Sequence, residues 1–259
     1  MALVKDPWEL ALMRNSGRRL AEVVAMLRES VRPGISTWEL DEMAEKMVRD
    51  LGAVPSFKGY RVLGIPTAFP ATICASPNEQ IVHGIPTDAA LLDGDIISID
   101  VGLVYGGYHS DCAFTIGVGE LSAETAQLLD ATEQSLYVGV SQALPGNRIG
   151  DIGHAIESYI EPTGFGIVQE YVGHGIGRRL HEPPSVPNYG KPGRGDLLKA
   201  GMCIAIEPMI TLGKPDTESL EDGWTVVTAD GSLSAHFEHT VAITPKGPEI
   251  LTVLESNLS

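Results

Sequence analysis

Two aspartates interrupt a stretch of sequence that otherwise has the composition of a buried β-hairpin. In ISIDVGLVYGGYHSDCAFT, which spans residues 97–115, Asp100 and Asp111 lie on either side of a turn at Gly106 and Gly107. A strand pairing in which partner numbers sum to 211 or 213 places both carboxylates on one face of the sheet, directly opposite or diagonal. Buried carboxylates are costly, so the pattern predicts either cations between the two acids or a bulge that exposes one of them.

The same pattern occurs again in the second half of the chain. DGDIISIDV aligns without gaps on AGMCIAIEP, which places Asp100 on Glu207, and HSDCAFTI aligns on HFEHTVAI, which places Asp111 on Glu238. If the two halves pack about a pseudo-twofold axis, the four acids gather at one point, where two divalent ions would balance their charge. Carboxylate-bridged metal pairs are typical of hydrolytic sites, and oxygen ligands with one imidazole favour manganese, iron or cobalt over structural zinc.

Histidines recur in the same way. The tripeptide HGI occurs at His83 and again at His174, and glycine beside a histidine suits a place where the backbone approaches a ligand closely. His174 is the better candidate metal ligand. His181, in GHGIGRRLHE, could instead donate a hydrogen bond to a developing oxyanion, and His83 could be a ligand or a proton carrier. The remaining histidines rank lower, because they lack a repeat partner or because strand parity opposes or does not settle their direction: His109, His154, His236 and His239.

Composition narrows the class of protein. The chain has 259 residues, 43% of them hydrophobic, and a net charge of −16, which argues against a nucleic-acid surface. The sequence contains no stretch of 18 apolar residues, so no membrane span is predicted, and the N-terminus does not resemble a signal peptide. Three cysteines without a CxxC spacing predict reduced thiols and a cytoplasmic location. Cys112 is expected to point to the face opposite Asp111, which argues against a cysteine nucleophile.

Four amphipathic segments must position these residues. Apolar residues at three- and four-residue steps predict helices over 7–31, from the capping box STWE to Gly52, over 122–143 and over 149–160. Each half therefore consists of helix, helix, loop, strand and strand. This order predicts an α+β fold with an antiparallel sheet covered by helices. We expect one compact catalytic domain over residues 1–259, with pseudo-repeat halves of about 7–117 and 119–250.

Six ordered motifs resemble those of the type I methionine aminopeptidases in their minimal bacterial form: NEQIVHGIP, DGDIISIDVG, YHSDCAF, YVGHGIGRRLHEPP, MCIAIEPMI and DGWTVVTADGSLSAHFEHT. The resemblance extends from the first helix to about Leu254. It implies the duplicated pita-bread (creatinase/aminopeptidase) fold. It also implies metal-dependent removal of the N-terminal methionine from peptides and nascent proteins, by attack of a metal-bound hydroxide on the first peptide bond.

The same resemblance implies a role for each site residue. His83 would contact the peptide nitrogen next to the cut, His181 the scissile carbonyl, and Glu207 would accept a proton from the attacking water. Cys74, Phe69 and Trp224 match the walls of a small pocket for methionine, which also demands a small second residue. Two divalent ions (cobalt, manganese or iron) would be held by five ligands: Asp100, Asp111, His174, Glu207 and Glu238.

The chain departs from the family pattern around the pocket. Phe69 stands where tyrosine is common, a few residues are inserted between Tyr60 and Phe69, and Leu180 stands where an aromatic is common. These differences affect the expected shape of the pocket. The expected partners are N-terminal methionine peptides, nascent chains and at most a transient ribosome contact, without DNA or membrane, and the expected state is a monomer. Two alternatives are a prolidase or X-Pro aminopeptidase, and a metal-free relative that only binds partners.

Overall fold

Four long helices form where the sequence predicts them. The computed structural model describes residues 4–254, and in it a short 3-10 turn follows the fourth helix at Glu161–Thr163. The agreement of all four ranges with prediction confirms the periodicity argument. The helices are α1 (Pro7–Ser30), α2 (Thr37–Asp50), α3 (Ala123–Ser141) and α4 (Ile149–Ile160).

The first two helices begin at reciprocal caps. The Asp6 carboxylate accepts hydrogen bonds from the backbone N–H groups of Trp8 and Glu9, and the Glu9 carboxylate accepts one from the Asp6 N–H. Ser36 and Glu39 form the same arrangement at α2, which confirms the predicted capping box. Such caps satisfy N–H groups that a helix leaves unpaired and fix the residue at which it begins.

Within residues 4–254 the strands form four sheets, and every ladder is antiparallel. One sheet carries the first-half acids and consists of β1 (Val54–Pro55), β2 (Ile73–Pro77), β4 (Ile96–Tyr105) and β5 (Tyr108–Gly117). Its second-half counterpart consists of β7 (Gly173–Gly175), β8 (Glu182–Val186), β9 (Cys203–Ile206), β14 (His239–Thr244) and β15 (Gly247–Ile250). Two smaller sheets consist of β6 (Gly166–Ile167), β10 (Met209–Thr211) and β13 (Ser234–His236), and of β3 (Gln80–Val82), β11 (Thr217–Ser219) and β12 (Val226–Thr228).

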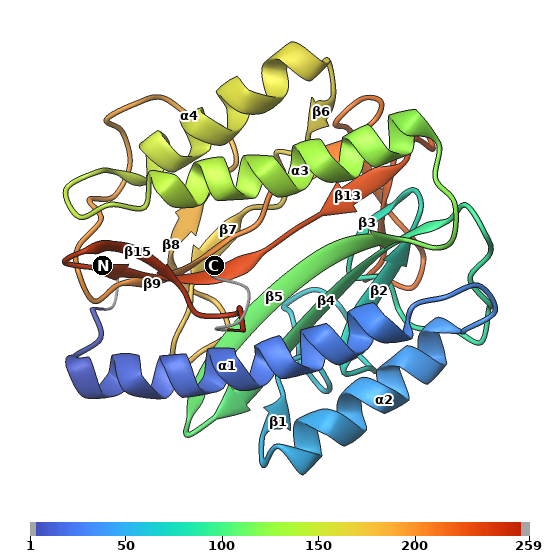
Figure 1. Ribbon diagram of the computed structural model, residues 1–259, viewed down its shortest axis with the longest axis horizontal. Helices are drawn as coiled ribbons and strands as arrows, with labels where there is room; N and C mark the ends of the chain where they lie inside the picture. Colours follow the sequence, from blue (N-terminus) through green and yellow to red (C-terminus); the bar gives the residue numbers. More distant parts are fainter. Residues whose placement is uncertain (1–3, 255–259) are drawn as a thin grey trace.

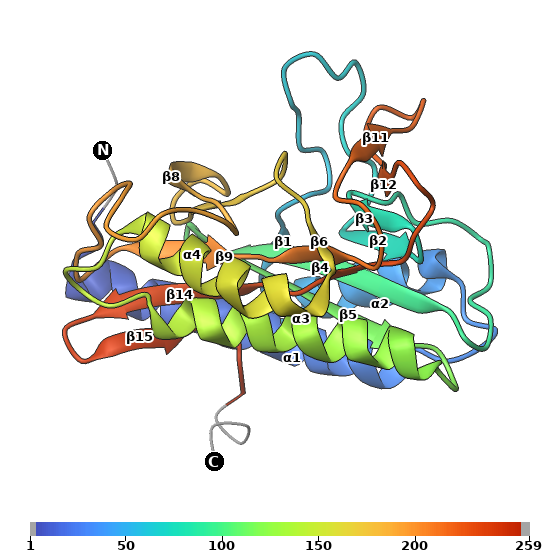
Figure 2. The same ribbon diagram turned by 90° about the horizontal axis from the view of Figure 1, so that it is seen from above.

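The helices cover one face of the sheets and loops cover the other. Figure 1 shows α1, α2 and α3 in front of the strands, and Figure 2 shows the same helices on one side with β8, β11 and β12 on the other. The main core lies between helices and strands and includes the fully buried Leu20, Leu27, Ile97, Ile99 and Phe114. This arrangement confirms the predicted α+β class. Within residues 4–254, no helix is long and apolar enough to cross a membrane.

The first hairpin has the register that the two aspartates require. Asp100 is paired with Ala113, so partner numbers sum to 213 and Asp111 lies diagonally from Asp100 on the same face. Gly106 and Gly107 form a two-residue turn with φ values of 60° and 81°, a conformation that glycine adopts without steric cost. The prediction that both acids share one face is confirmed.

The two halves meet where β5 lies beside the segment that leads into β14. The Glu238 N–H donates to the Ala113 carbonyl at 2.9 Å. Two residues further along, the Thr240 hydroxyl donates to the Asp111 carbonyl at 2.8 Å and accepts from the Asp111 N–H at 3.0 Å. The join therefore passes through the acids of both halves. The boundaries at 7–117 and 119–250 within one domain stay a prediction.

Candidate metal centre and active-site cavity

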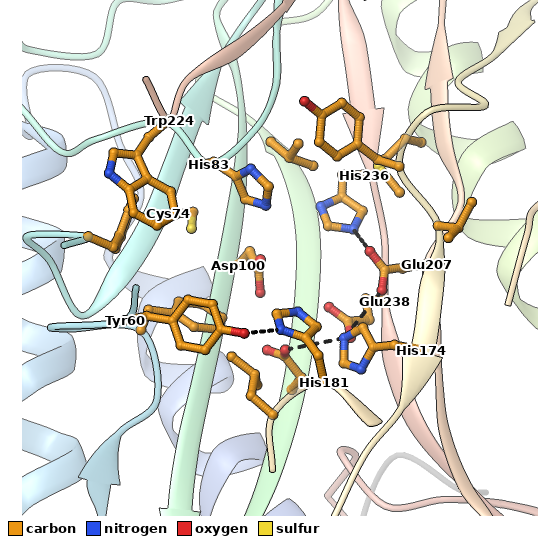
Figure 3. A pocket seen from close by; sticks show the side chains of 18 of the residues that line it. Tyr60, Cys74, His83, Asp100, His174, His181, Glu207, Trp224, His236 and Glu238 are labelled. Atoms are coloured by element: carbon orange, nitrogen blue, oxygen red, sulfur yellow. Dashed lines mark hydrogen bonds and ion pairs between the residues drawn. The ribbon is translucent and has the colours of Figure 1, made fainter. Parts of the chain in front are cut away.

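All ten residues singled out from the sequence line one cavity of about 190 Å³ on the face that the helices leave open. Figure 3 shows their side chains converging from both halves of the chain. The structure thus brings together every predicted site residue, while the assignment of each to metal or substrate stays a prediction. The ten are Phe69, Cys74, His83, Asp100, Asp111, His174, His181, Glu207, Trp224 and Glu238.

The four acids come from equivalent places in the two halves. Asp100 lies on β4 and Asp111 on β5, whereas Glu207 directly follows β9 and Glu238 directly precedes β14. Since β9 and β14 pair as antiparallel neighbours, the two glutamates extend that pairing by one step. The predicted repeat is therefore visible as two strand pairs that each deliver two carboxylates to the same floor.

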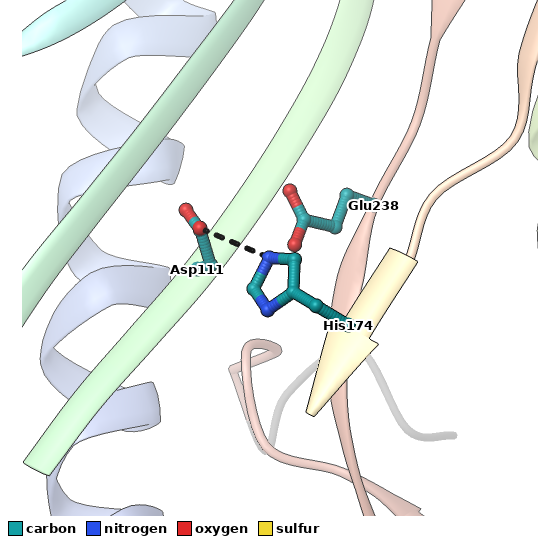
Figure 4. Close-up of side chains that lie close together, drawn as sticks. All are labelled: Asp111, His174 and Glu238. Carbon is teal, nitrogen blue, oxygen red and sulfur yellow. Dashed lines mark ion pairs between the residues drawn. The ribbon is translucent and has the colours of Figure 1, made fainter. Parts of the chain in front are cut away.

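His174 reaches into this group with the nitrogen that a metal would need. Ligand atoms of Asp111, His174 and Glu238 lie within 4.8 Å of one another. Figure 4 shows these three side chains pointing toward one another. His174 Nε2 is 3.9 Å from Asp111 Oδ2 and 3.6 Å from Glu207 Oε1. Its Nδ1 lies 2.9 Å from the Gly175 carbonyl, which can only accept, so Nδ1 carries the proton and Nε2 keeps its lone pair.

Several oxygens at this point are buried without a partner. Asp100 Oδ1, Asp111 Oδ1 and Glu238 Oε1 accept no hydrogen bond from any residue in the described range 4–254. Buried polar atoms are nearly always paired, and a group of orphaned carboxylate oxygens around an imidazole nitrogen is the donor set of a divalent cation. The residues present therefore fit the metal ions that the sequence predicted.

Titration of the acids reflects the same charge problem. Burial raises the pKa of Asp100 to about 7, although a hydrogen bond from Asp111 opposes this, and burial with the Asp100 charge raises that of Glu207 to about 8. Burial and the neighbouring carboxylates raise the pKa values of Asp111 and Glu238 well above their usual range. Burial lowers the pKa of His174 to about 3, so its ring is neutral. Without a cation the acids are therefore partly protonated at neutral pH, and a divalent ion would let them ionise.

His236 is a cavity residue that sequence reasoning ranked too low. Its Nε2 is 3.8 Å from Glu207 Oε2, and neither ring nitrogen has a hydrogen-bond partner among the residues described. Burial and His83 lower its pKa to about 3. The available signal was its position two residues before Glu238, because residues two apart in a strand share a face.

The other low-ranked histidines lie outside the cavity. The His109 ring is hydrogen-bonded to the Ser56 hydroxyl at 2.9 Å, and His154 is exposed on α4. His239 is on the helix side of the sheet, where its Nδ1 is 2.8 Å from the Thr252 hydroxyl. Cys112 also faces this side, as predicted, and the three cysteines are free.

His181 is held by a residue that the sequence did not identify. The Tyr60 hydroxyl lies 2.6 Å from His181 Nδ1, although the two residues are far apart in the chain. Burial lowers the pKa of His181 and raises that of Tyr60, so the ring is neutral and the phenol keeps its proton. With Tyr60 as donor, the imidazole proton is on Nε2, where it can donate into the cavity.

His83 has an unusual backbone that aims its ring at the cavity. Its φ of 59° is in the left-handed region, which costs a non-glycine residue about 1–3 kcal/mol. The ring packs edge-on against Tyr171 and Trp224, with centroid separations of 5.7 and 6.5 Å. Burial and His181 lower its pKa to about 4. Strain of this kind is typical of functional positions.

The glycines of the two HGI segments have a common explanation. A Cβ on Gly84 would lie 2.3 Å from the Ala75 carbonyl oxygen, and one on Gly175 would lie 2.3 Å from that of Pro183. Neither place tolerates a side chain. The close approach beside each histidine is thus made by the backbone of a neighbouring strand, and the predicted approach to a ligand stays a prediction.

An apolar pocket adjoins the acids. Cys74 on β2 is paired directly with Asp100, so its side chain lies next to the carboxylates. Phe69 and Trp224 meet edge to face at 5.3 Å, and Leu180 is also buried in the lining. Figure 3 shows Trp224 and Cys74 on the side of the cavity away from Glu207. The cavity thus has a charged end and an apolar end.

A cluster of carboxylates and one imidazole, sited beside an apolar pocket at the join of two repeated halves, defines a metal-dependent hydrolase. The chain belongs to metallopeptidase family M24, whose sequence profile matches residues 11–245.

Similar proteins carry more specific names. A methionine aminopeptidase of Clostridium perfringens is 51% identical over 255 residues, covering 98% of this chain and 100% of that one. Methionine aminopeptidase 1 of Bacillus subtilis is 50% identical over 252 residues, covering 97% and 99%. The crystal structure of methionine aminopeptidase from Thermotoga maritima superposes with a TM-score of 0.94 at 41% identity and covers 98% and 100% of the two chains.

Prolidase from Pyrococcus furiosus superposes with a TM-score of 0.77 at 23% identity, and this chain covers 66% of its length. At that identity the likeness shows the fold alone. Together these neighbours confirm the predicted pita-bread fold.

Proposed function

We propose that this protein removes the N-terminal methionine from peptides and nascent chains whose second residue is small. The observation that carries the proposal is the single cavity in which orphaned carboxylates of both halves adjoin a small apolar pocket. The names of the relatives at 51% and 50% identity support the same activity. An apolar pocket of this size suits an unbranched side chain such as that of methionine.

Two divalent ions would be held at the charged end. Asp111 and Glu238 would be shared by the two ions, His174 and Glu207 would complete one site, and Asp100 would complete the other. Cobalt, manganese and iron suit this oxygen-rich set with one imidazole. When bound, such ions supply Lewis acidity and make water available as hydroxide at neutral pH.

The protein's own side chains would orient the peptide and move protons. His181, protonated on Nε2, would donate a hydrogen bond to the oxygen of the scissile carbonyl as negative charge develops there. His83, on the opposite side of the cavity, would contact the nitrogen of the next peptide bond. Glu207 would accept the proton of the attacking water. Its two carboxylate oxygens lie 3.6 Å from His174 Nε2 and 3.8 Å from His236 Nε2.

The pocket would set the specificity for the first residue. The methionine side chain would lie against Cys74, Phe69 and Trp224, while the free α-amine would lie at the Asp100 end. Because the amine and the side chain are fixed together, only the first peptide bond reaches the charged end. We further propose that the enzyme is a cytoplasmic monomer that meets nascent chains, with at most transient ribosome contact and no binding to DNA or membranes.

Metal removal and add-back test the proposal. The purified protein is stripped with a chelator and supplied singly with Mn²⁺, Co²⁺ or Fe²⁺, and release of the first residue from Met-Ala-Ser and Ala-Pro-Ser is measured. We expect methionine release only with metal and no cleavage of Ala-Pro-Ser. Cleavage of Ala-Pro-Ser alone would show a prolidase-type activity instead. Asp100→Asn should abolish methionine release while circular dichroism shows an intact fold.

A further inference from the structure

Residues 61–68 form a loop that rises from the edge of the cavity. Backbone hydrogen bonds close its base: the Phe69 N–H donates to the Tyr60 carbonyl at 2.9 Å, and the Gly59 N–H donates to the Phe69 carbonyl at 2.8 Å. Tyr60 and Phe69 both line the cavity, so the loop starts and ends there. In Figure 2 the loop (cyan) and the hairpin of β11 and β12 project side by side from the face that the helices leave open.

The aliphatic residues of this loop divide into one anchor and two outward positions. Ile65 packs on the apolar cluster that contains Phe69 and Trp224. Val62 lines the cavity while it remains 42% exposed, and Leu63 at the tip is 102% exposed. The anchor fixes the loop, Val62 extends the apolar lining of the cavity toward solvent, and Leu63 follows it in the chain as an exposed side chain.

A polypeptide substrate has to pass the 61–68 loop where it leaves the cavity. The cavity is small, so a chain bound by its first two residues leaves through the mouth from the third residue onward. Exposed aliphatic side chains beside a ligand cavity provide contact area that is released from water when a ligand covers it. The apolar surface is continuous with the cavity through Val62, which singles out the emerging substrate as the occupant.

We propose that residues 61–68 form a binding edge for the substrate beyond its second residue, with Val62 and Leu63 favouring apolar side chains at its third and fourth positions. This inference rests on the proposed function and extends its substrate class from the first two residues to the first four.

Peptide kinetics test the edge directly. With the Mn²⁺-loaded enzyme, KM and kcat are compared for Met-Ala-Ser, Met-Ala-Ser-Ser-Ser and Met-Ala-Leu-Phe-Ser, in the wild type and in the double variant Val62→Ser, Leu63→Ser. Both side chains are exposed, so the variant should fold normally. We expect the wild type to have a KM about fivefold lower for the apolar pentapeptide than for the serine pentapeptide. The double variant should reduce this ratio to below twofold. The single variant Leu63→Ser, whose side chain lies outside the cavity lining, should leave kcat/KM for Met-Ala-Ser within twofold.

A matched control is Leu92→Ser, since Leu92 is also an exposed leucine but lies outside the cavity lining. It should keep the fivefold preference. The proposal is overturned if the wild type shows no preference, if the double variant retains it, or if Leu63→Ser also loses Met-Ala-Ser cleavage. A change in molecular mass by light scattering with an unchanged preference would identify an interface between copies instead. Failure of the proposed function is distinguishable, because the wild type would then release no methionine from Met-Ala-Ser.

Discussion

The hydrogen bond at Nδ1 decides whether the Nε2 atom of each of two site histidines carries a lone pair or a proton toward the cavity. His174 Nδ1 faces the Gly175 carbonyl, a pure acceptor, so its Nε2 offers a lone pair. His181 Nδ1 faces the Tyr60 hydroxyl, which can donate as well as accept, and when it donates, His181 Nε2 carries the proton. One ring is thereby suited to a metal and the other to an oxyanion. The chemistry of each ring is set by a neighbour rather than by the ring itself.

Removal of the Tyr60 hydroxyl should therefore affect the chemical step. Tyr60→Phe keeps the aromatic ring but no longer donates to His181 Nδ1, so the imidazole can take either tautomer. We expect kcat for Met-Ala-Ser to fall about tenfold, which is about 1.4 kcal/mol, with KM within twofold. Steady-state kinetics measure both. Calorimetric Mn²⁺ affinity should be unchanged, and a variant with the wild-type kcat would rule out this role of Tyr60.

Because the pKa of Asp100 is raised, this residue should make the metal-free protein less stable as pH rises. A carboxyl whose pKa rises from its usual value to about 7 on folding binds its proton more tightly in the folded state. The loss of folding free energy caused by ionising this buried carboxyl is nearly absent at pH 4, grows as pH rises, and is complete above pH 7. Asp100→Asn removes this cost, so the stability of the variant relative to wild type should increase from pH 5 to pH 8, by about 2–3 kcal/mol.

Urea unfolding in the presence of chelator measures this difference at both pH values. The buried histidines are shared by both proteins, so their opposite pH dependence cancels in the comparison. Saturating Mn²⁺ should reverse the ranking at pH 8, because bound metal stabilises only the wild-type ligand set. Equal differences at pH 5 and pH 8 would show that Asp100 is not the group that titrates.

At the scale of elements, the start of α1 holds the segment that carries His181. Lys5 and Glu182 form an ion pair of 3.0 Å whose side chains are only 5% and 1% exposed, and Glu182 also accepts from the Arg179 N–H. Glu9, in the first turn of α1, accepts from Arg178 at 3.2 Å. Residues 178–182 are thus tied to the N-terminal segment by a buried and an exposed charge pair.

Loss of the buried pair should destabilise the fold much more than loss of an exposed one. Lys5→Met leaves the Glu182 carboxylate buried without its partner, which should lower the free energy of unfolding by about 3–5 kcal/mol. Adding Glu182→Gln in the same chain should restore most of it. Arg14→Met, which breaks the exposed pair with Glu249, is the matched control and should cost about 1 kcal/mol or less. Urea denaturation decides, and equal costs for Lys5 and Arg14 would contradict the argument.

Long elements could be predicted from the sequence, while short ones and long-range partners could not. The four helices have periodic faces and local caps, and the hairpin of β4 and β5 has its own turn, so each is encoded by neighbouring residues. The four acids could be predicted because each half of the repeat carries two of them at equivalent positions. Strands such as β3 and β7 are three residues long and exist only through their partners. The contact of Tyr60 with His181 joins residues 121 apart, for which no local pattern exists.

At the scale of the whole molecule, the centre is built on the join between two halves. Asp111 lies on β5 of the first half, and Glu238 immediately precedes β14 of the second. Hydroxyls replace part of the ladder between them: Thr240 bonds both backbone groups of Asp111, and Thr115 does the same for His236. The separation of the acids is therefore set by the backbone pairing of Ala113 with Glu238 together with two threonine side chains that bridge the halves.

Thr240→Val should loosen this join without changing the volume of the side chain. The backbone N–H and carbonyl of Asp111 would lose their partner in a buried place, so the free energy of unfolding should fall by about 2 kcal/mol. Since Asp111 would no longer be held at its distance from Glu238, the Kd for Mn²⁺ should rise about tenfold. Calorimetry and urea denaturation measure the two effects, and Thr240→Ser, which keeps the hydroxyl, should restore most of both. If Thr240→Val weakens stability but leaves Mn²⁺ affinity at the wild-type value, the bridge supports the fold without setting the geometry of the centre.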